Sequence, residues 1–102
     1  MMQGDCYGLE IEIKKADGTA VTDSEVSDVE ITVGRLTKTF AKEEVSYSGG
    51  CWVFHLTQEE TFRFPAGRAK AQVRVVWKDG TVEGVPIGEI PVFESISKVV
   101  LE

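Results

Sequence analysis

Apolar and polar residues alternate along most of this chain, which is typical of β-strands with one buried and one exposed face. The clearest run covers residues 69–78, and residues 9–13 and 29–33 repeat the pattern over shorter lengths. In the longest run the apolar face consists of Ala69, Ala71, Val73, Val75 and Trp77. No segment of ten residues or more shows a helical period, so the sequence predicts an all-β protein.

Two glycine turns, Gly49-Gly50 and Asp79-Gly80, each lie between two extended runs and predict two antiparallel hairpins. The paired runs are residues 45–48 with 51–56, and 69–78 with 81–87. In the first hairpin Trp52, Phe54 and Leu56 share a face. We expect this larger apolar set to face the core, which leaves His55 outward.

The remaining segments are shorter. Residues 22–25 predict a cap with one helical turn, and residues 57–60 predict a turn between sheets that Thr57 caps. Short strands are predicted at residues 36–40 and 62–64, and extended segments at 92–93 and 96–101.

Seven or eight strands at intervals of about 8–12 residues favour a sandwich or a barrel. An immunoglobulin-like antiparallel β-sandwich of about seven strands, forming a single domain over residues 1–102, suits the chain length best. The Cys–Trp–Cys spacing of antibody domains is absent, so this likeness concerns architecture alone.

The outer strands are the predicted place for function, because a small β-protein must either protect its unpaired edges or use them. Lys38 interrupts the apolar face of residues 36–40, and Pro86 and Pro91 cannot donate ladder hydrogen bonds. Both segments are therefore predicted to be edges. The candidate interaction residues are Leu36, Phe40, Val85 and Ile87.

Charge and composition narrow the classes of function. Eleven basic and 17 acidic residues give a net charge of −6, which argues against nucleic acid and against an anionic membrane surface as partners. His55 is the only histidine, and no nucleophile motif accompanies it, so we expect no enzyme, no metal and no cofactor. The acidic loop with Asp23, Glu25 and Asp28 is interpreted as solubilising charge rather than a calcium site.

The aromatic residues raise one alternative. Trp52 and Trp77 lie on apolar strand faces and are predicted to be core, while Tyr47 and Phe93 remain candidate surface aromatics. A carbohydrate- or cell-surface-binding module would need such rings on its outside. It is the second hypothesis, and an enzyme accessory subunit is the third.

Cys6 and Cys51 leave two interpretations open, namely two free thiols or one disulfide between the first strand and the central hairpin. Residues 1–8 show neither a basic segment nor an apolar one of signal-peptide type. No apolar run approaches the length of a membrane span. Leu101-Glu102 is either native or a remnant of a purification tag.

The run 56–61 (LTQEET), the segment 71–74 (AQVR) with Asp79-Gly80, and the terminal Ile96-Ser97-Lys98 resemble small structural proteins of phages and prophages of Gram-positive bacteria. Over residues 52–101 the layout is similar to the immunoglobulin-like N-terminal domain of phage baseplate upper proteins. This resemblance implies a non-catalytic assembly role in a tail or baseplate, through contacts with copies of itself or with other phage proteins. It also implies synthesis in the host cytoplasm without a signal peptide, and a place in the virion.

Overall fold

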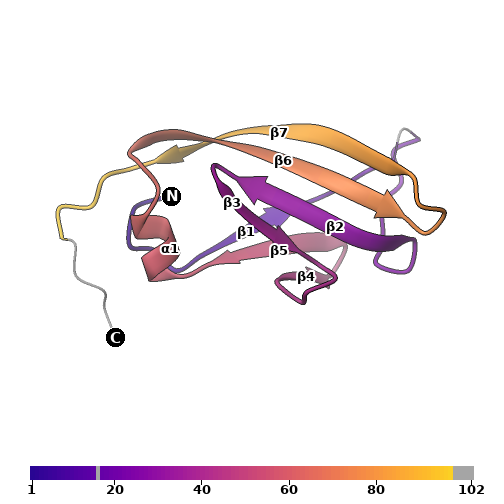
Figure 1. The fold of residues 1–102 in the computed structure, drawn as a ribbon. Coiled ribbons are helices and arrows are strands. Elements are labelled where there is room, and N and C mark those ends of the chain that lie inside the picture. The colour runs from indigo at the N-terminus through magenta and orange to yellow at the C-terminus, as the bar shows by residue number, and fades with distance from the viewer. Residues whose placement is uncertain (16, 98–102) are drawn as a thin grey trace.

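The computed structural model describes residues 1–15 and 17–97. This part of the chain forms seven strands and one short helix (Figure 1). In chain order the elements are β1 (Tyr7–Ile11), β2 (Val26–Val33), β3 (Leu36–Thr39), β4 (Val45–Ser48), β5 (Cys51–Leu56), α1 (Gln58–Phe62), β6 (Gly67–Trp77) and β7 (Val82–Val92).

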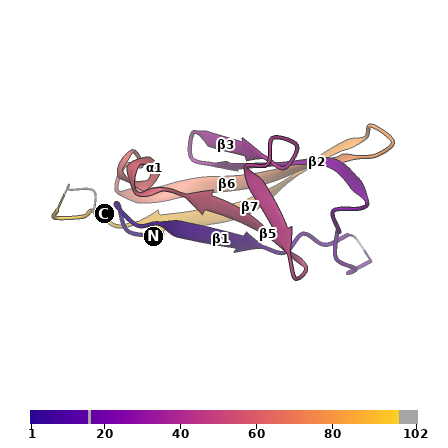
Figure 2. The same cartoon turned by 90° about the horizontal axis from the view of Figure 1, so that it is seen from below.

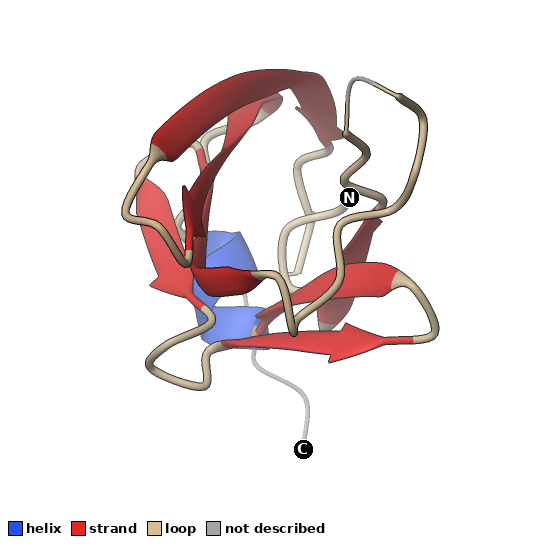
Figure 3. Cartoon of the chain, turned by 90° about the vertical axis from the view of Figure 1, so that its right-hand side faces the viewer, coloured by secondary structure: helices blue, strands red, loops and turns tan. Residues whose placement is uncertain are grey.

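The strands form two antiparallel sheets that pack against each other as a β-sandwich (Figures 1 and 3). One sheet has the order β1-β5-β4 and the other has the order β3-β2-β6-β7. The predicted all-β class and the number of about seven strands are confirmed. In this strand order β2 lies between β3 and β6, whereas the second strand of constant-type immunoglobulin domains lies between the first and the fifth.

The core is built from the inner faces of both sheets, as the alternating pattern predicts. Trp52 and Phe54 of β5 are fully buried, and the Trp52 Nε1–H donates a hydrogen bond to the Val21 carbonyl oxygen at 3.2 Å. His55, the next residue along β5, is exposed, which confirms its predicted orientation. Trp77 is only partly buried and packs on the margin of the core, so its predicted burial holds in part.

The two glycine-turn hairpins are confirmed. β4 pairs with β5 across Gly49-Gly50, and β6 pairs with β7 across the Asp79-Gly80 turn. The second hairpin is longer than predicted, because β7 runs through both prolines to Val92. This is possible because β7 is an outer strand, where a missing N–H on the solvent side costs no ladder hydrogen bond.

The prediction of a strand at residues 62–64 is wrong, since helix α1 continues to Phe62 and β6 begins only at Gly67. The predicted Thr57 cap explains why. Thr57 Oγ1 accepts from the Glu60 N–H at 3.2 Å, and the Glu60 carboxylate accepts from the Thr57 N–H at 2.9 Å. This reciprocal capping box starts helix α1, which extends to Phe62 and so includes the first residue of the predicted strand.

Three further expectations need correction. Residues 22–25 form a turn rather than a helical turn, with the Glu25 N–H donating to the Thr22 carbonyl. The strand predicted at 36–40 ends at Thr39. Of the extended segment predicted at 96–101, residues 98–101 lie outside the described residues, and residues 96 and 97 are not in a strand.

Candidate functional site

The outer edge of β7 is the most exposed strand surface of the molecule. Among residues 1–15 and 17–97, β7 is the last strand of its sheet and pairs with β6 alone (Figure 1). From Val82 to Glu89 every residue of β7 is exposed, including Val85 at 56% and Ile87 at 42%. The predicted candidates Val85 and Ile87 therefore lie on an accessible edge.

Strand register explains why an apolar side chain is exposed here. Val85 lies directly opposite Val73 of β6, so both side chains project toward the same face of the sheet. Val73 is 3% exposed whereas Val85 is 56% exposed. The three-stranded sheet thus covers β6 but leaves this part of β7 uncovered. Val85 therefore lies on the inner face of the four-stranded sheet, at a place where the three-stranded sheet does not cover that face.

A bulge places Ile87 on this edge. Ala71 pairs with Gly88, but Gln72 pairs with Pro86, so Ile87 is the additional residue on the β7 side. Gly88 has a φ of 130°, a conformation that residues with a side chain rarely adopt. The glycine therefore permits the bulge that turns Ile87 away from the regular ladder.

The N-terminal segment closes one end of the edge. The Met1 ammonium donates to the Pro91 carbonyl at 3.0 Å, the Phe93 N–H donates to the Met1 carbonyl at 2.8 Å, and the Gln3 N–H donates to the Phe93 carbonyl at 2.9 Å. Within the described residues, the backbone edge over 82–90 has no such neighbour. We call this stretch the open β7 edge.

The other predicted edge, β3, lies on the opposite side of the same sheet but is tied to the core. Leu36 and Phe40 are half-buried, and the Phe40 ring meets Trp52 edge-on with ring centroids 5.1 Å apart. Lys38 Nζ donates to the His55 carbonyl at 2.6 Å and to Glu60 Oε1 at 2.9 Å. Leu36, Lys38 and Phe40 therefore contact other parts of the same chain and are less available to a partner at this edge.

The predicted surface aromatics lie apart. Tyr47 is half-buried and tilts against Trp52 with ring centroids 4.7 Å apart, so it contributes to the core margin. Phe93 is 58% exposed and follows the end of β7, next to Met2. The structure does not bring the two rings together.

The polar candidates are placed as follows. Cys6 and Cys51 are free thiols. Asp28 accepts from the N–H groups of Val29 and Ala41, and Glu25 accepts from Thr22 and pairs with Lys15. The hydrogen bond from Lys15 and those from Thr22 lower the pKa of Glu25 below its ordinary value. Among residues 1–15 and 17–97 no group of three or more potential metal ligands gathers.

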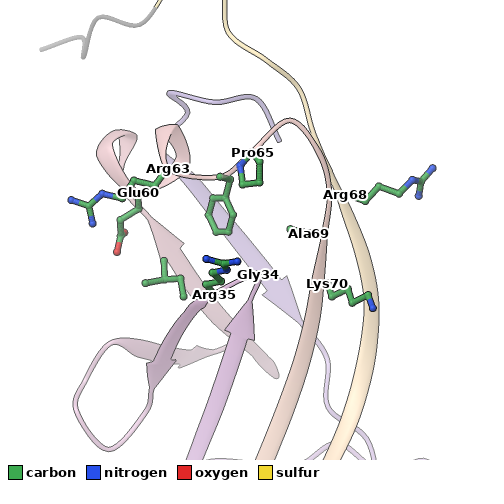
Figure 4. A pocket seen from close by; sticks show the side chains of 10 residues that line it. Gly34, Arg35, Glu60, Arg63, Pro65, Arg68, Ala69 and Lys70 are labelled. Carbon is green, nitrogen blue, oxygen red and sulfur yellow. The ribbon is translucent and has the colours of Figure 1, made fainter.

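A basic hollow at the end of the sandwich was not anticipated (Figure 4). It has a volume of about 740 Å³ and lies where α1, the β2–β3 turn and the start of β6 meet. We define the basic hollow by its lining: Gly34, Arg35, Leu36, Glu60, Arg63, Phe64, Pro65, Arg68, Ala69 and Lys70. The sequence does hold a signal for it, because residues 61–78 contain five cations and no carboxylate in a chain of net charge −6.

Comparison with protein-family models, with curated protein sequences and with solved structures finds no match for this chain. In the part of the chain that the structure describes, no helix is long and apolar enough to cross a membrane.

Proposed function

We propose that this chain is a non-catalytic structural protein that assembles through protein–protein contacts, with the open β7 edge accepting an extended strand from a neighbouring subunit. The observation that carries this proposal is that, in the described part of the chain, backbone without a neighbouring strand coincides with exposed apolar side chains at Val85 and Ile87. In strand addition, main-chain hydrogen bonds supply affinity and alternate side chains supply specificity. The open β7 edge offers both.

The assembly that we propose is a phage or prophage tail or baseplate. The support is the resemblance of residues 52–101 to small phage structural proteins, together with the packing of two antiparallel sheets. An acidic surface suits a subunit that must stay soluble before it assembles. Genes for portal, tail-tube or tape-measure proteins are the expected neighbours of the coding gene, and a neighbourhood of metabolic genes would contradict the phage assignment.

Substitution of the edge tests the docking mode. Val85→Lys and Ile87→Lys each place a charge on the open β7 edge, which disfavours pairing with another strand. The matched control is Thr37→Lys, an exposed position on the β3 edge of the same sheet. We expect light scattering to show smaller particles for both β7 variants and wild-type particles for the control. Unchanged particle size in both β7 variants would overturn the proposal.

The carbohydrate-binding alternative is supported less well. A sugar platform needs exposed rings side by side, whereas Tyr47 packs against Trp52 and Phe93 lies at the end of another sheet. Binding on a glycan array that Phe93→Ala abolishes would reverse this order of preference.

A further inference from the structure

The rim of the basic hollow carries uncompensated positive charge. Arg35, Arg63, Arg68 and Lys70 are exposed, and within the described residues none of them has a carboxylate oxygen within 4.0 Å. The one carboxylate of the lining, Glu60, already pairs with Lys38 at 2.9 Å. Four such cations in a chain of net charge −6 mark a surface suited to an anionic partner.

The lining below this rim is apolar. Phe64 and Ala69 are 6% and 8% exposed, and Leu36 is half-buried. Phe64 lies against Gly34, where a Cβ atom would come within 2.8 Å of the ring. A partner that fits the hollow therefore combines an apolar side chain with carboxylates.

The cations are spread around the hollow rather than aimed at one point. Figure 4 shows the Arg63 and Arg68 side chains pointing to opposite sides, with Arg35 between them. Because these two side chains point in opposite directions, a single compact anion cannot lie beside both of their guanidinium groups. A peptide segment with carboxylates on either side of an apolar residue would reach several.

The chain itself carries such a segment at its other end. Val82, at the tip of the β6–β7 hairpin, is 50% exposed and lies between Asp79 and Glu83. Asp79 accepts a hydrogen bond from the Thr81 N–H at 2.8 Å, which holds its carboxylate at the turn. The hairpin tip and the basic hollow lie at opposite ends of a molecule 46 Å long (Figures 1 and 2).

The residues around the hairpin tip carry a net negative charge, opposite to that of the rim of the basic hollow. Residues 12–15, 17–25 and 78–83, which form this end of the molecule, contain six carboxylates and three lysines. Their net charge of −3 opposes the positive rim of the hollow. Two copies placed end to end would therefore attract each other, most strongly at low salt.

We propose that the hairpin tip of one copy docks into the basic hollow of the next, with Val82 against the apolar lining and Asp79 and Glu83 at the cationic rim. The contact joins different surfaces of two copies, so it is heterologous and propagates into a ring or a filament. It shares only Val82 and Glu83 with the open β7 edge, and its ionic character makes the two contacts separable by salt.

Two complementary variants test this contact. Arg68→Glu disables the hollow, and Asp79→Asn with Glu83→Lys disables the tip, while the asparagine side chain retains an oxygen that can cap the turn. Lys42→Glu, which makes the same charge change outside the hollow, is the matched control. All of these variants are made in the Ile87→Lys background, which disfavours the β7 contact so that only the docking contact is measured. In sedimentation velocity from about 1 µM to 1 mM we expect the Ile87→Lys parent and the control to form a concentration-dependent series, and each docking variant to lose it.

Mixing the two docking variants gives the decisive result. One variant retains only a tip and the other only a hollow, so an equimolar mixture should form a dimer and nothing larger. Raising the salt to about 0.5 M should dissociate that dimer, since the Debye length falls to a few ångströms. An Ile87→Lys parent that is monomeric at low salt, or a mixture of variants that stays monomeric, would overturn the contact. Particles lost in Val85→Lys but unaffected by Arg68→Glu would support the β7 proposal and overturn this one.

Discussion

The two outer strands of the four-stranded sheet differ in how they treat their free edges. β3 has four residues, and its neighbourhood is tied down by Lys38, which bonds to β5 and α1, and by Phe40, which packs on Trp52. β7 has eleven residues and is exposed from Val82 to Glu89. Small β-proteins normally shorten, charge or cover their edges. β3 follows that rule and β7 follows it only in part, which makes β7 the interface we propose.

Truncating an aromatic ring at each edge should give the largest difference between the two regions. Phe40→Ala should lower the free energy of unfolding by about 2–3 kcal/mol, because it removes a half-buried ring that packs on Trp52. Phe93→Ala should change it by about 0.5 kcal/mol or less, because that ring is 58% exposed. Urea denaturation measures both values. Equal losses would mean that the two edges are equally integrated into the core.

A methyl group at Gly88 should disturb β7 through the backbone alone. The site is open, with no atom within 4 Å of the position that a Cβ would occupy, but its φ of 130° strains any residue with a side chain. Gly88→Ala should cost about 1–3 kcal/mol in the free energy of unfolding. Gly84→Ala provides the control, because Gly84 lies on the same strand without a positive φ. A neutral Gly88→Ala would show that the bulge at Ile87 adjusts freely.

Removing the Lys38 ammonium should loosen β3. Burial opposes ionisation of Glu60, but hydrogen bonds from Thr57 and the charge and hydrogen bond of Lys38 more than offset it and hold the pKa of Glu60 below its ordinary value of 4.5. Lys38→Met should cost about 1 kcal/mol at neutral pH.

The pH dependence identifies the cause of that loss. Since the folded pKa of Glu60 is lowered, its contribution to stability is complete above pH 4.5 and falls as the pH drops through the folded pKa. The difference between wild type and Lys38→Met should therefore shrink on acidification. A difference that is constant with pH would assign the loss instead to the cation–π contact of Lys38 Nζ, which lies 5.5 Å from the centroid of the Phe54 ring.

The smallest effect on stability is expected at the proposed interface itself. Ile87→Lys should change the free energy of unfolding by no more than about 0.5 kcal/mol, because the side chain is already 42% exposed in the single chain. Leu36→Lys, at the half-buried β3 edge, should cost more. Melting temperatures measure both effects. A larger decrease for Leu36→Lys than for Ile87→Lys would show that Leu36 stabilises the fold, whereas Ile87 is available for contact with a partner.

The fold was predictable where a pattern was long and bounded by glycine. The alternation over residues 69–78 and the Gly49-Gly50 and Asp79-Gly80 turns led to β6 and both hairpins. The alternation of Phe62 and Phe64 spans only three residues, too few to separate a strand from the end of a helix. There the capping pair Thr57 and Glu60 decided the outcome.

The candidate sites were predictable only in part. Pro86 and Pro91 indicated an edge, and Val85 and Ile87 lie on it. By pattern, Leu36, Phe40 and Tyr47 are ordinary strand residues. Only the tertiary packing shows that they belong to the margin of the core, where Phe40 and Tyr47 contact Trp52. Arg35 lies far from Arg63 and Arg68 in the sequence, so nothing local predicted that they line one hollow.

Local sequence specifies the strands, the hairpin turns and the orientation of buried and exposed faces, because these depend on neighbouring residues and a period of two. The packing of the two sheets sets the strand order, the difference between the two edges and the grouping of cations at one end. Those features depend on how far one sheet extends over the other and on which distant segments meet there. Alternation along a strand indicates which side chains favour burial, but the position of the opposing sheet determines which of them are covered.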